Sequence, residues 1–297
     1  MSLNDLLFTR LSTDERIAGA LAEFAGVPAV FNSEFPPDQQ DGWKGNVQYP
    51  RISYRIDMQV DPKRSSSGQL SIAVYTERDM PLCEQIEGYV RDCLKDVLMM
   101  PDGEAPFCVA WARTEPYEFT DMAVIARMVI FDILEYPSQE TTDPDPVMAM
   151  NNYIKKLFPD SIVLGMDRIG EFTSTADRPV WYCRLNSLEK ASGYCENQIM
   201  WFNAVMSVHL ICPDAPDRLK MAAALAQMLS VATEVIMLDD SPMTMKGVRV
   251  DNRADYLRDG QMTVTGYYGC LRKGELKHLV TGAGINFNFT VGGKPNG

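Results

Sequence analysis

The sequence predicts an α+β fold made of two similar domains, each a mostly antiparallel sheet packed against helices. Three observations lead to this prediction. Long stretches alternate between apolar and polar residues with the period of a strand, and others repeat apolar residues at helical spacing. A segment rich in proline and acid then divides the chain near its middle. We therefore predict a first domain over 1–136, a linker over 137–146, and a second domain with a C-terminal strand arm over 147–297.

Composition is that of an ordinary globular protein. The 297 residues are 46% hydrophobic and 23% charged, which suits two domains with normal cores. No apolar run approaches the roughly 20 residues that span a bilayer, and the N-terminus lacks the features of a signal peptide. We expect a protein made and kept in the cytoplasm, without a membrane partner. The odd number of cysteines, without a CxxC pair, predicts reduced core residues: Cys83, Cys93, Cys108, Cys183, Cys195, Cys212 and Cys270.

Charge is distributed unevenly between the halves. Residues 1–150 contain 25 acidic and 12 basic residues, whereas residues 151–297 contain 15 and 16. DNA affinity comes chiefly from clustered Lys and Arg, so the acidic half is unsuited to holding a phosphate backbone. It would suit a wall past which DNA moves without specific binding.

The first elements are a helix and a long loop. Residues 14–25 place apolar side chains at helical spacing, with Thr13 as a possible cap and Gly26 as the end. Residues 31–48 form a polar loop that contains an isolated Trp43. Such a loop is uncommon unless it contacts something, and Trp43 is therefore a candidate contact residue. The alternative is that this tryptophan covers the edge of its own core.

A hairpin and a helix follow the loop. Residues 50–60 and 69–76 alternate as two strands, and 61–68 between them contain only polar and turn-forming residues. Asp79 can cap a helix with Pro81 in its first turn. The basic tip residues Lys63 and Arg64 have two interpretations: a flexible surface loop, or a contact with an acidic neighbour that salt should weaken.

Two further strands, from Phe107 and from Met122, complete a first sheet of at least four strands. The second is apolar through its latter half and is predicted to be central or covered on both faces. After the linker, the second domain begins with a helix over 147–158. It continues with strands from Pro179 and from Ile199, a helix behind Asp214, and further strands as far as Leu271.

The second domain repeats the pattern of the first. Pro179, Trp181, Arg184 and Leu185 align with Pro50, Ile52, Arg55 and Ile56, and the strand from Ser207 aligns with the strand from Ser71. Asp214 and Pro216 repeat the cap and first turn of Asp79 and Pro81. A tyrosine ahead of a methionine-led strand occurs as Tyr117 with Met122 and as Tyr256 with Met262. The shared order predicts a tandem duplication; the alternative is two unrelated α+β domains of similar size.

The C-terminal arm has no counterpart in this repeat. Alternation in GINFNFTV places four apolar residues on one face, and glycines flank the segment. A lone strand must pair with a sheet edge. It either closes its own domain or adds to a neighbouring subunit, and we favour the second role. The interaction candidates of this arm are Ile285, Phe287, Phe289 and Val291.

No pattern of residues predicts catalysis. The two histidines, His209 and His278, lack a second histidine at metal-ligand spacing, and the glycine cluster at Gly282 precedes a strand pattern rather than a helix. Asp239 and Asp240 are adjacent, but nearby acids are usually solvated loop residues. We therefore predict no enzyme activity, no catalytic or metal-binding residues, and no cofactor.

The first half resembles the tail terminator and tail completion proteins of long-tailed bacteriophages. The resemblance covers residues 1–137, extends to the second half through the repeat, and rests on fold patterns without chemistry. It is carried by YPRISYRIDMQV followed by SIAVYTERDMP, in particular by Pro50, Ile52, Tyr54, Val74, Tyr75, Thr76, Asp79 and Pro81.

This resemblance implies a structural protein of the virion neck, assembled in the host cytoplasm. Such a protein forms a homo-oligomeric ring on the tail tube, stops its polymerisation and presents a surface to the head connector. The implied partners are the tail tube protein and the head-tail connector protein, with DNA passing through the lumen. Because this chain carries two copies where the family usually has one, three or six chains could form the ring. The alternative is a soluble ligand-binding module or an enzyme with an unrecognised site, for instance around Trp43 or Trp181.

Overall fold

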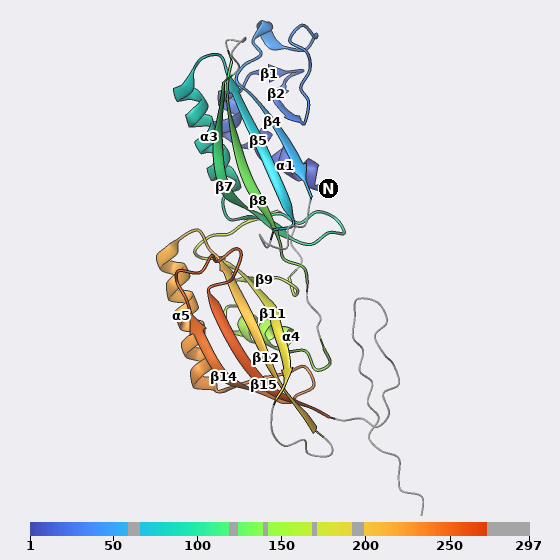
Figure 1. The fold of residues 1–297 in the computed structure, drawn as a ribbon, viewed down its shortest axis with the longest axis vertical. Coiled ribbons are helices and arrows are strands. Elements are labelled where there is room, and N and C mark those ends of the chain that lie inside the picture. Colours follow the sequence, from blue (N-terminus) through green and yellow to red (C-terminus); the bar gives the residue numbers. More distant parts are fainter. Residues whose placement is uncertain (59–65, 119–123, 139–141, 168–170, 192–198, 272–297) are drawn as a thin grey trace, which may run out of the picture. The chain divides into compact units, whose positions relative to one another are not determined.

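The structure, a computed structural model, describes the chain except for residues 59–65, 119–123, 139–141, 168–170, 192–198 and 272–297 (Figure 1). The fold is α+β with mostly antiparallel sheets, as predicted. The chain divides into two compact units. The first comprises Met1–Tyr136 and a short strand from later in the chain, β10 (Phe172–Thr173), and the second comprises most of the remainder.

The first unit opens with two helices, of which only one was predicted. Helix α1 (Leu3–Thr13) begins at a capping box between Ser2 and Asp5, and it buries leucines at helical spacing. Helix α2 (Glu15–Ala20) is capped by Asp14 rather than by Thr13. The helix expected over 14–25 is therefore too long. Residues 25 and 26 have positive φ and form the turn between β1 (Glu23–Phe24) and β2 (Val27–Pro28).

The first sheet contains the predicted hairpin. Strands β4 (Arg51–Asp57) and β5 (Gly68–Thr76) pair antiparallel, β8 (Ile125–Glu135) lies beside β5, and β7 (Phe107–Glu118) forms the edge. A short parallel strand, β3 (Val30–Asn32), and the turn η1 (Lys44–Asn46) belong to the segment predicted as a loop. The central position expected for β8 is confirmed. The edge strand β7 carries a bulge between Trp111 and Arg113, which disfavours pairing with another chain.

Helix α3 (Met80–Leu94) lies on one face of this sheet, behind its predicted cap. The Asp79 carboxylate accepts a hydrogen bond of 2.9 Å from the Leu82 amide. Cys83, Ile86 and Val90 enter the core, as the helical spacing predicts. After α3, β6 (Val97–Leu98) pairs with β10.

The described residues of the second unit form two helices and a six-stranded sheet. The helices are α4 (Pro146–Leu157) and α5 (Ala215–Ala232). The strands are β9 (Ile162–Val163), β11 (Val180–Lys190), β12 (Ile199–Ile211), β13 (Glu234–Ile236), β14 (Pro242–Val250) and β15 (Met262–Leu271). Alternate residues of β12 are buried in the core of this unit: Ala204, Met206, Val208 and Leu210.

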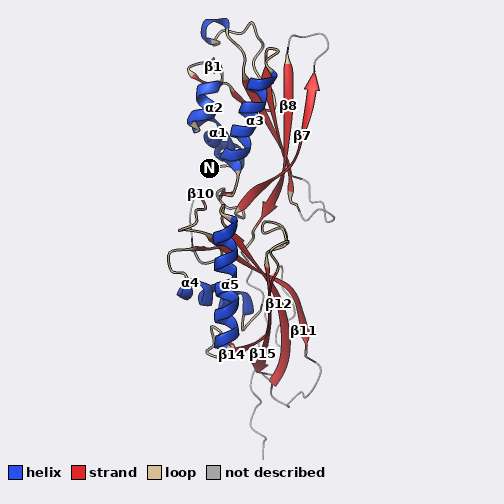
Figure 2. Cartoon of the chain, turned by 90° about the vertical axis from the view of Figure 1, so that its left-hand side faces the viewer, coloured by secondary structure: helices blue, strands red, loops and turns tan. Residues whose placement is uncertain are grey.

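Both units have the same strand order. In the first it is β3-β4-β5-β8-β7, and in the second β9-β11-β12-β15-β14 with β13 added at the end. The first strand of each list is parallel to its neighbour and the other pairs are antiparallel. Helices cover one face of each sheet (Figure 2), and each unit has its own hydrophobic core against that face.

The correspondence extends to strand register. Ile52 lies opposite Val74 in the first hairpin, and the residues aligned with them, Trp181 and Leu210, lie opposite each other in the second. The helix caps also correspond, since Asp214 accepts from the Asp217 amide as Asp79 accepts from Leu82. One proposed equivalence differs: Tyr117 is in strand β7, whereas Tyr256 lies between β14 and β15.

Parts of the segment predicted as a linker pack on the second unit. The Tyr182 hydroxyl donates to the Pro137 carbonyl at 3.0 Å, and the hydroxyls of Thr142 and Tyr268 lie 3.3 Å apart. Asp145 caps α4 by accepting from two amides. The connection therefore belongs to the second unit instead of joining the units as a free chain. Within the described ranges, no helix is long and apolar enough to span a membrane.

Candidate functional site

Trp43 lies in a small aromatic cluster on the first unit. Its side chain is only 9% exposed and makes edge contacts with Phe24 and Phe31 at centroid distances of 5.0 and 5.8 Å. Its indole N–H donates to the Pro37 carbonyl at 3.3 Å. Trp43 therefore covers the edge of its own domain, which is the second of its two interpretations, and its ring is not presented to a partner.

A buried arginine holds the long loop around Trp43 against the sheet. The side chain of Arg51 on β4 is nearly inaccessible, and its guanidinium lies 3.7 Å from the centroid of Phe35 and 4.3 Å from that of Tyr49. It donates to Asp38 Oδ1 at 2.8 Å and to the Tyr49 hydroxyl at 2.9 Å. A buried cation between aromatic faces is a strong anchor. We interpret this cluster as structural.

A second polar network joins helix α3 to the edge of the first sheet. Glu87 is almost fully buried, accepts from the Thr114 hydroxyl at 2.7 Å, and pairs with Arg127 Nε at 2.6 Å. Arg91 lies over the ring of Trp111 at 4.0 Å. These contacts satisfy the buried carboxylate, and they leave the half-exposed Trp111 on the outside of β7.

The remaining interaction candidates lie outside the described residues. These are the hairpin-tip pair Lys63 and Arg64, and the C-terminal arm residues Ile285, Phe287, Phe289 and Val291.

Burial shifts the pKa values of several titratable groups in the second unit toward their neutral forms. Burial lowers the pKa of His209 to about 4, and its Nδ1 lies 3.0 Å from the Tyr256 carbonyl oxygen. Because a carbonyl only accepts, Nδ1 carries the proton in that bond. Burial likewise raises the pKa of the Cys183 thiol to about 12 and that of Cys270 to about 11, so their thiolates are disfavoured at neutral pH. No group of three or more His, Cys, Asp or Glu among the described residues is placed to hold a metal ion.

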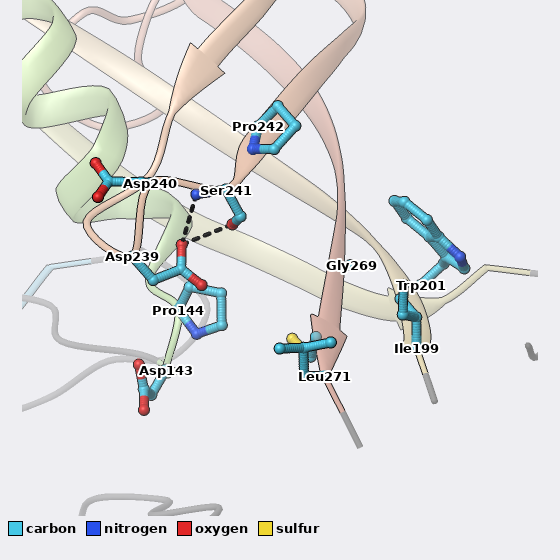
Figure 3. Close-up of a pocket in the computed structure, with 11 residues that line it drawn as sticks. Asp143, Pro144, Ile199, Trp201, Asp239, Asp240, Ser241, Pro242, Gly269 and Leu271 are labelled. Carbon is cyan, nitrogen blue, oxygen red and sulfur yellow. Dashed lines mark hydrogen bonds between the residues drawn. The ribbon is translucent and has the colours of Figure 1, made fainter. Parts of the chain in front are cut away.

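The second unit has an open pocket of about 520 Å³ at one end of its sheet (Figure 3). It lies between the start of β12, the end of β15, the β13–β14 turn and the residues before α4. Ser241 in that turn donates to Asp239 from both its amide and its hydroxyl. The lining residues are Asp143, Pro144, Ile199, Trp201, Asp239, Asp240, Ser241, Pro242, Gly269, Cys270 and Leu271.

An aromatic platform extends from this pocket along the sheet. Trp201 and Tyr267 stack with parallel rings at 4.9 Å, and Lys246 Nζ lies 4.9 Å from the Tyr267 centroid. The absence of a side chain at Gly269 leaves room for the indole, since a Cβ there would lie 3.2 Å from the ring of Trp201. The pocket thus combines one aromatic wall with carboxylates at its mouth, an arrangement suited to a cationic group.

The outer face of helix α5 is unusual for a surface helix. From Met221 to Ala232 the helix has no charged residue, although its outer side is accessible: Val231 is 75% exposed and Met228 46%. The corresponding helix α3 instead exposes polar residues, including Glu84, Gln85 and Asp92. A surface helix normally has a polar outer stripe, so the face of α5 is a candidate interaction surface. We call it the α5 face; it consists of Lys220, Ala223, Ala224, Gln227, Met228, Ser230 and Val231.

Comparison of the chain with protein-family models and with curated proteins finds no match.

The α5 face and the pocket are not among the candidates predicted from the sequence. The sequence does contain a signal for the α5 face, because the twelve residues from Met221 to Ala232 include no charge. Asp239 and Asp240 are predicted to be solvated loop residues, and both are exposed. That they line one pocket with Trp201 and Asp143 could not be predicted, since the pocket joins four segments that are distant in sequence.

Proposed function

We propose that the chain is a structural, ring-forming component that caps the tail tube and joins it to the head connector in a phage or phage-like particle. The observation that carries this proposal is the repetition of one sheet topology, with matching hairpin register and matching helix caps. The repetition supports a tandem duplication of a unit whose sequence resembles tail completion proteins. Duplicated units in one chain suit an assembly in which equivalent positions recur around an axis.

The duplication leaves two arrangements of the ring. Three chains would supply six copies of the sheet unit, and six chains would build a ring with a second tier. The excess of acid in residues 1–150 suits a lumen through which DNA passes without being held. The hairpin tip and the C-terminal arm are proposed as contacts with the tube protein, the connector or a neighbouring subunit.

The experiment is to measure the mass of the purified chain by light scattering and to image it by negative stain, with and without tail tubes. Rings of three or six chains, or density at one end of tubes, are expected. Deleting residues 282–297 should leave the melting transition intact and impair ring formation or docking. A chain that stays monomeric at all concentrations and does not bind tubes would contradict the proposal.

A ligand-binding module is the second candidate, and the pocket beside Trp201 favours it. Its mixture of an aromatic wall and carboxylates fits a small organic cation. Native mass spectrometry of the chain from its own host should then show a bound small molecule that Trp201→Ala releases. An unliganded mass would count against this candidate.

A further inference from the structure

The end of strand β15 has an open edge in the second unit. Its pairing with β12 continues as far as Leu271, whereas its pairing with β14 ends where Tyr267 lies opposite Thr244. Pro242, at the start of β14, has no N–H with which to continue that ladder. Among the strands that the structure describes, residues 268–271 therefore pair on one side only. An open edge presents backbone N–H and C=O groups that a further strand can satisfy.

The pocket of about 520 Å³ lies along this open edge (Figure 3). The end of β15 lines one side of it, and the β13–β14 turn lines the other. Trp201 forms the aromatic wall: Tyr267 stacks on one face of its indole, which leaves the other face to the pocket. The carboxylates of Asp143, Asp239 and Asp240 also line the pocket, and none of them forms an ion pair with another described residue. An aromatic face beside unpaired carboxylates favours a cation.

The chain that follows Leu271 carries basic residues that this pocket lacks. Residues 272–281 lie outside the described residues and have the sequence RKGELKHLVT. Positions 272–277 contain three basic residues, and no other six consecutive residues of this acidic chain contain as many. Leu276 and Leu279 add side chains that suit the apolar part of the pocket lining. The segment thus complements the pocket in both charge and hydrophobicity.

We propose that this segment of the same chain turns back at Gly274, pairs along the open edge of β15, and places the Lys277 ammonium against the Trp201 ring. We call it the return segment. Glycine readily adopts the positive φ of a tight turn. An extended chain advances about 3.3 Å per residue, so Lys277 can return to the pocket from the rim at Leu271. Its ammonium would there pair with the Asp239 carboxylate, and the backbone around it would satisfy the open edge.

Attachment favours the chain's own segment over other occupants. The return segment begins at the rim of the pocket, and a short tether gives it an effective concentration in the millimolar range, well above that of a second copy in solution. The basic hairpin tip of a second copy, residues 61–68, is a poorer fit because it contains no leucine, isoleucine, valine or aromatic residue. The return segment is therefore the occupant that the observations favour.

This inference does not rest on the proposed tail role, because the contact forms within one chain. It gives the C-terminal arm a fixed starting point, since docking of the return segment would hold the chain against the second unit and leave residues 282–297 to extend from it. The return segment also competes with a small organic cation, because both require the free face of Trp201. Failure to form rings would leave this inference intact, whereas a pocket that holds a small molecule would contradict it.

Carbodiimide cross-linking of the full chain tests the contact. This reagent joins an amine to a carboxylate only where the two groups touch, so peptide mapping by mass spectrometry should find Lys277 linked to Asp239 or Asp240. Lys44 and Glu23, which are 2.8 Å apart and exposed in the first unit, provide the internal control link. In an equal mixture of isotope-labelled and unlabelled chains, the Lys277 link should contain no hybrid of heavy and light peptides, because it forms within one chain.

Substitution in the pocket tests the aromatic wall. Trp201→Ala should lower the yield of the Lys277 link roughly tenfold relative to the control link. It should also raise the rate of tryptic cleavage after Lys277 by a similar factor, because a docked segment is protected from proteolysis. Trp111→Ala is the matched control, since Trp111 is 47% exposed on the first unit and its loss should leave both measurements unchanged. A cooperative melting transition shows that each variant is folded.

Exchange of charge tests the ion pair. Lys277→Glu should abolish the link. Combining it with Asp239→Lys or Asp240→Lys, according to the carboxylate that the mapping identifies, should restore a link with the amine and the carboxylate exchanged. The inference is overturned if the full chain forms the control link without a Lys277 link, or if the Lys277 link is found only between two chains. It is also overturned if Trp201→Ala changes neither measurement in a folded chain, or if the exchanged pair does not link.

Discussion

Replacing Arg51 with alanine should destabilise the first unit and release the segment around Trp43. The Arg51 guanidinium is buried between Phe35 and Tyr49 and joins β4 to this segment. A desolvated cation over an aromatic ring contributes up to about 2 kcal/mol, and a hydrogen bond to a charged group about 1.5–3 kcal/mol. The hydrogen bond to Asp38 should contribute near the lower end of the second range, because the Asp38 side chain is 51% exposed.

The net loss should be about 2–4 kcal/mol, since alanine also removes the cost of burying the charge. Urea denaturation gives the change in free energy of unfolding, and hydrogen exchange of residues 33–49 shows whether the loss is local. Arg55→Ala is the matched control, because Arg55 lies on the same strand with an exposed side chain. The loss of stability in Arg51→Lys should lie between those of Arg51→Ala and Arg55→Ala, since lysine keeps the charge without the planar guanidinium. A loss no greater than that of Arg55→Ala, with exchange unchanged in the segment, would refute this account of the anchor.

Three further predictions concern stability. Glu87→Ala should cost about 2–3 kcal/mol, because it removes the buried partner of Arg127 and the acceptor of the Thr114 hydroxyl, and Arg127 then keeps only the exposed Glu84. Glu84→Ala should cost under about 1 kcal/mol in the same urea titration. His209 has a pKa of about 4 in the fold against 6.5 in the unfolded chain, so the unfolded chain takes up the proton first as the pH is lowered. Stability therefore falls as the pH is lowered through this window. Between pH 7 and 5 the native chain should lose about 2 kcal/mol more than His209→Gln, and parallel pH profiles would contradict this. Gly68→Ala should cost about 1–3 kcal/mol because its Cβ would lie 2.4 Å from a backbone oxygen, while Gly88→Ala, in open space on helix α3, should be neutral or stabilising in thermal melts.

Local sequence patterns were sufficient to predict most of the helices and strands, but not those at the N-terminus. The alternation of β4, β5 and β12, and the caps of α3 and α5, were predicted because period and capping chemistry are properties of neighbouring residues. Helix α1 was missed although its leucines have helical spacing. Helix α2 was extended too far because an apolar residue at position 24 fits both a helix and a short strand, and only contact with Trp43 decides between them.

The sequence by itself determined the α+β class, the division near residue 136, and the correspondence of the two hairpins, because alternation, turn residues and caps are encoded within a few positions. Only the tertiary structure decided the environment of single side chains. Arg51 has the sequence context of an outward strand residue and is buried by a loop that folds over it. The uncharged stretch of α5 is typical of a helix that is buried on all sides. In the structure the sheet covers only one side of this helix, and its other side is exposed. Burial depends on which distant segments meet, and no local pattern contains that information.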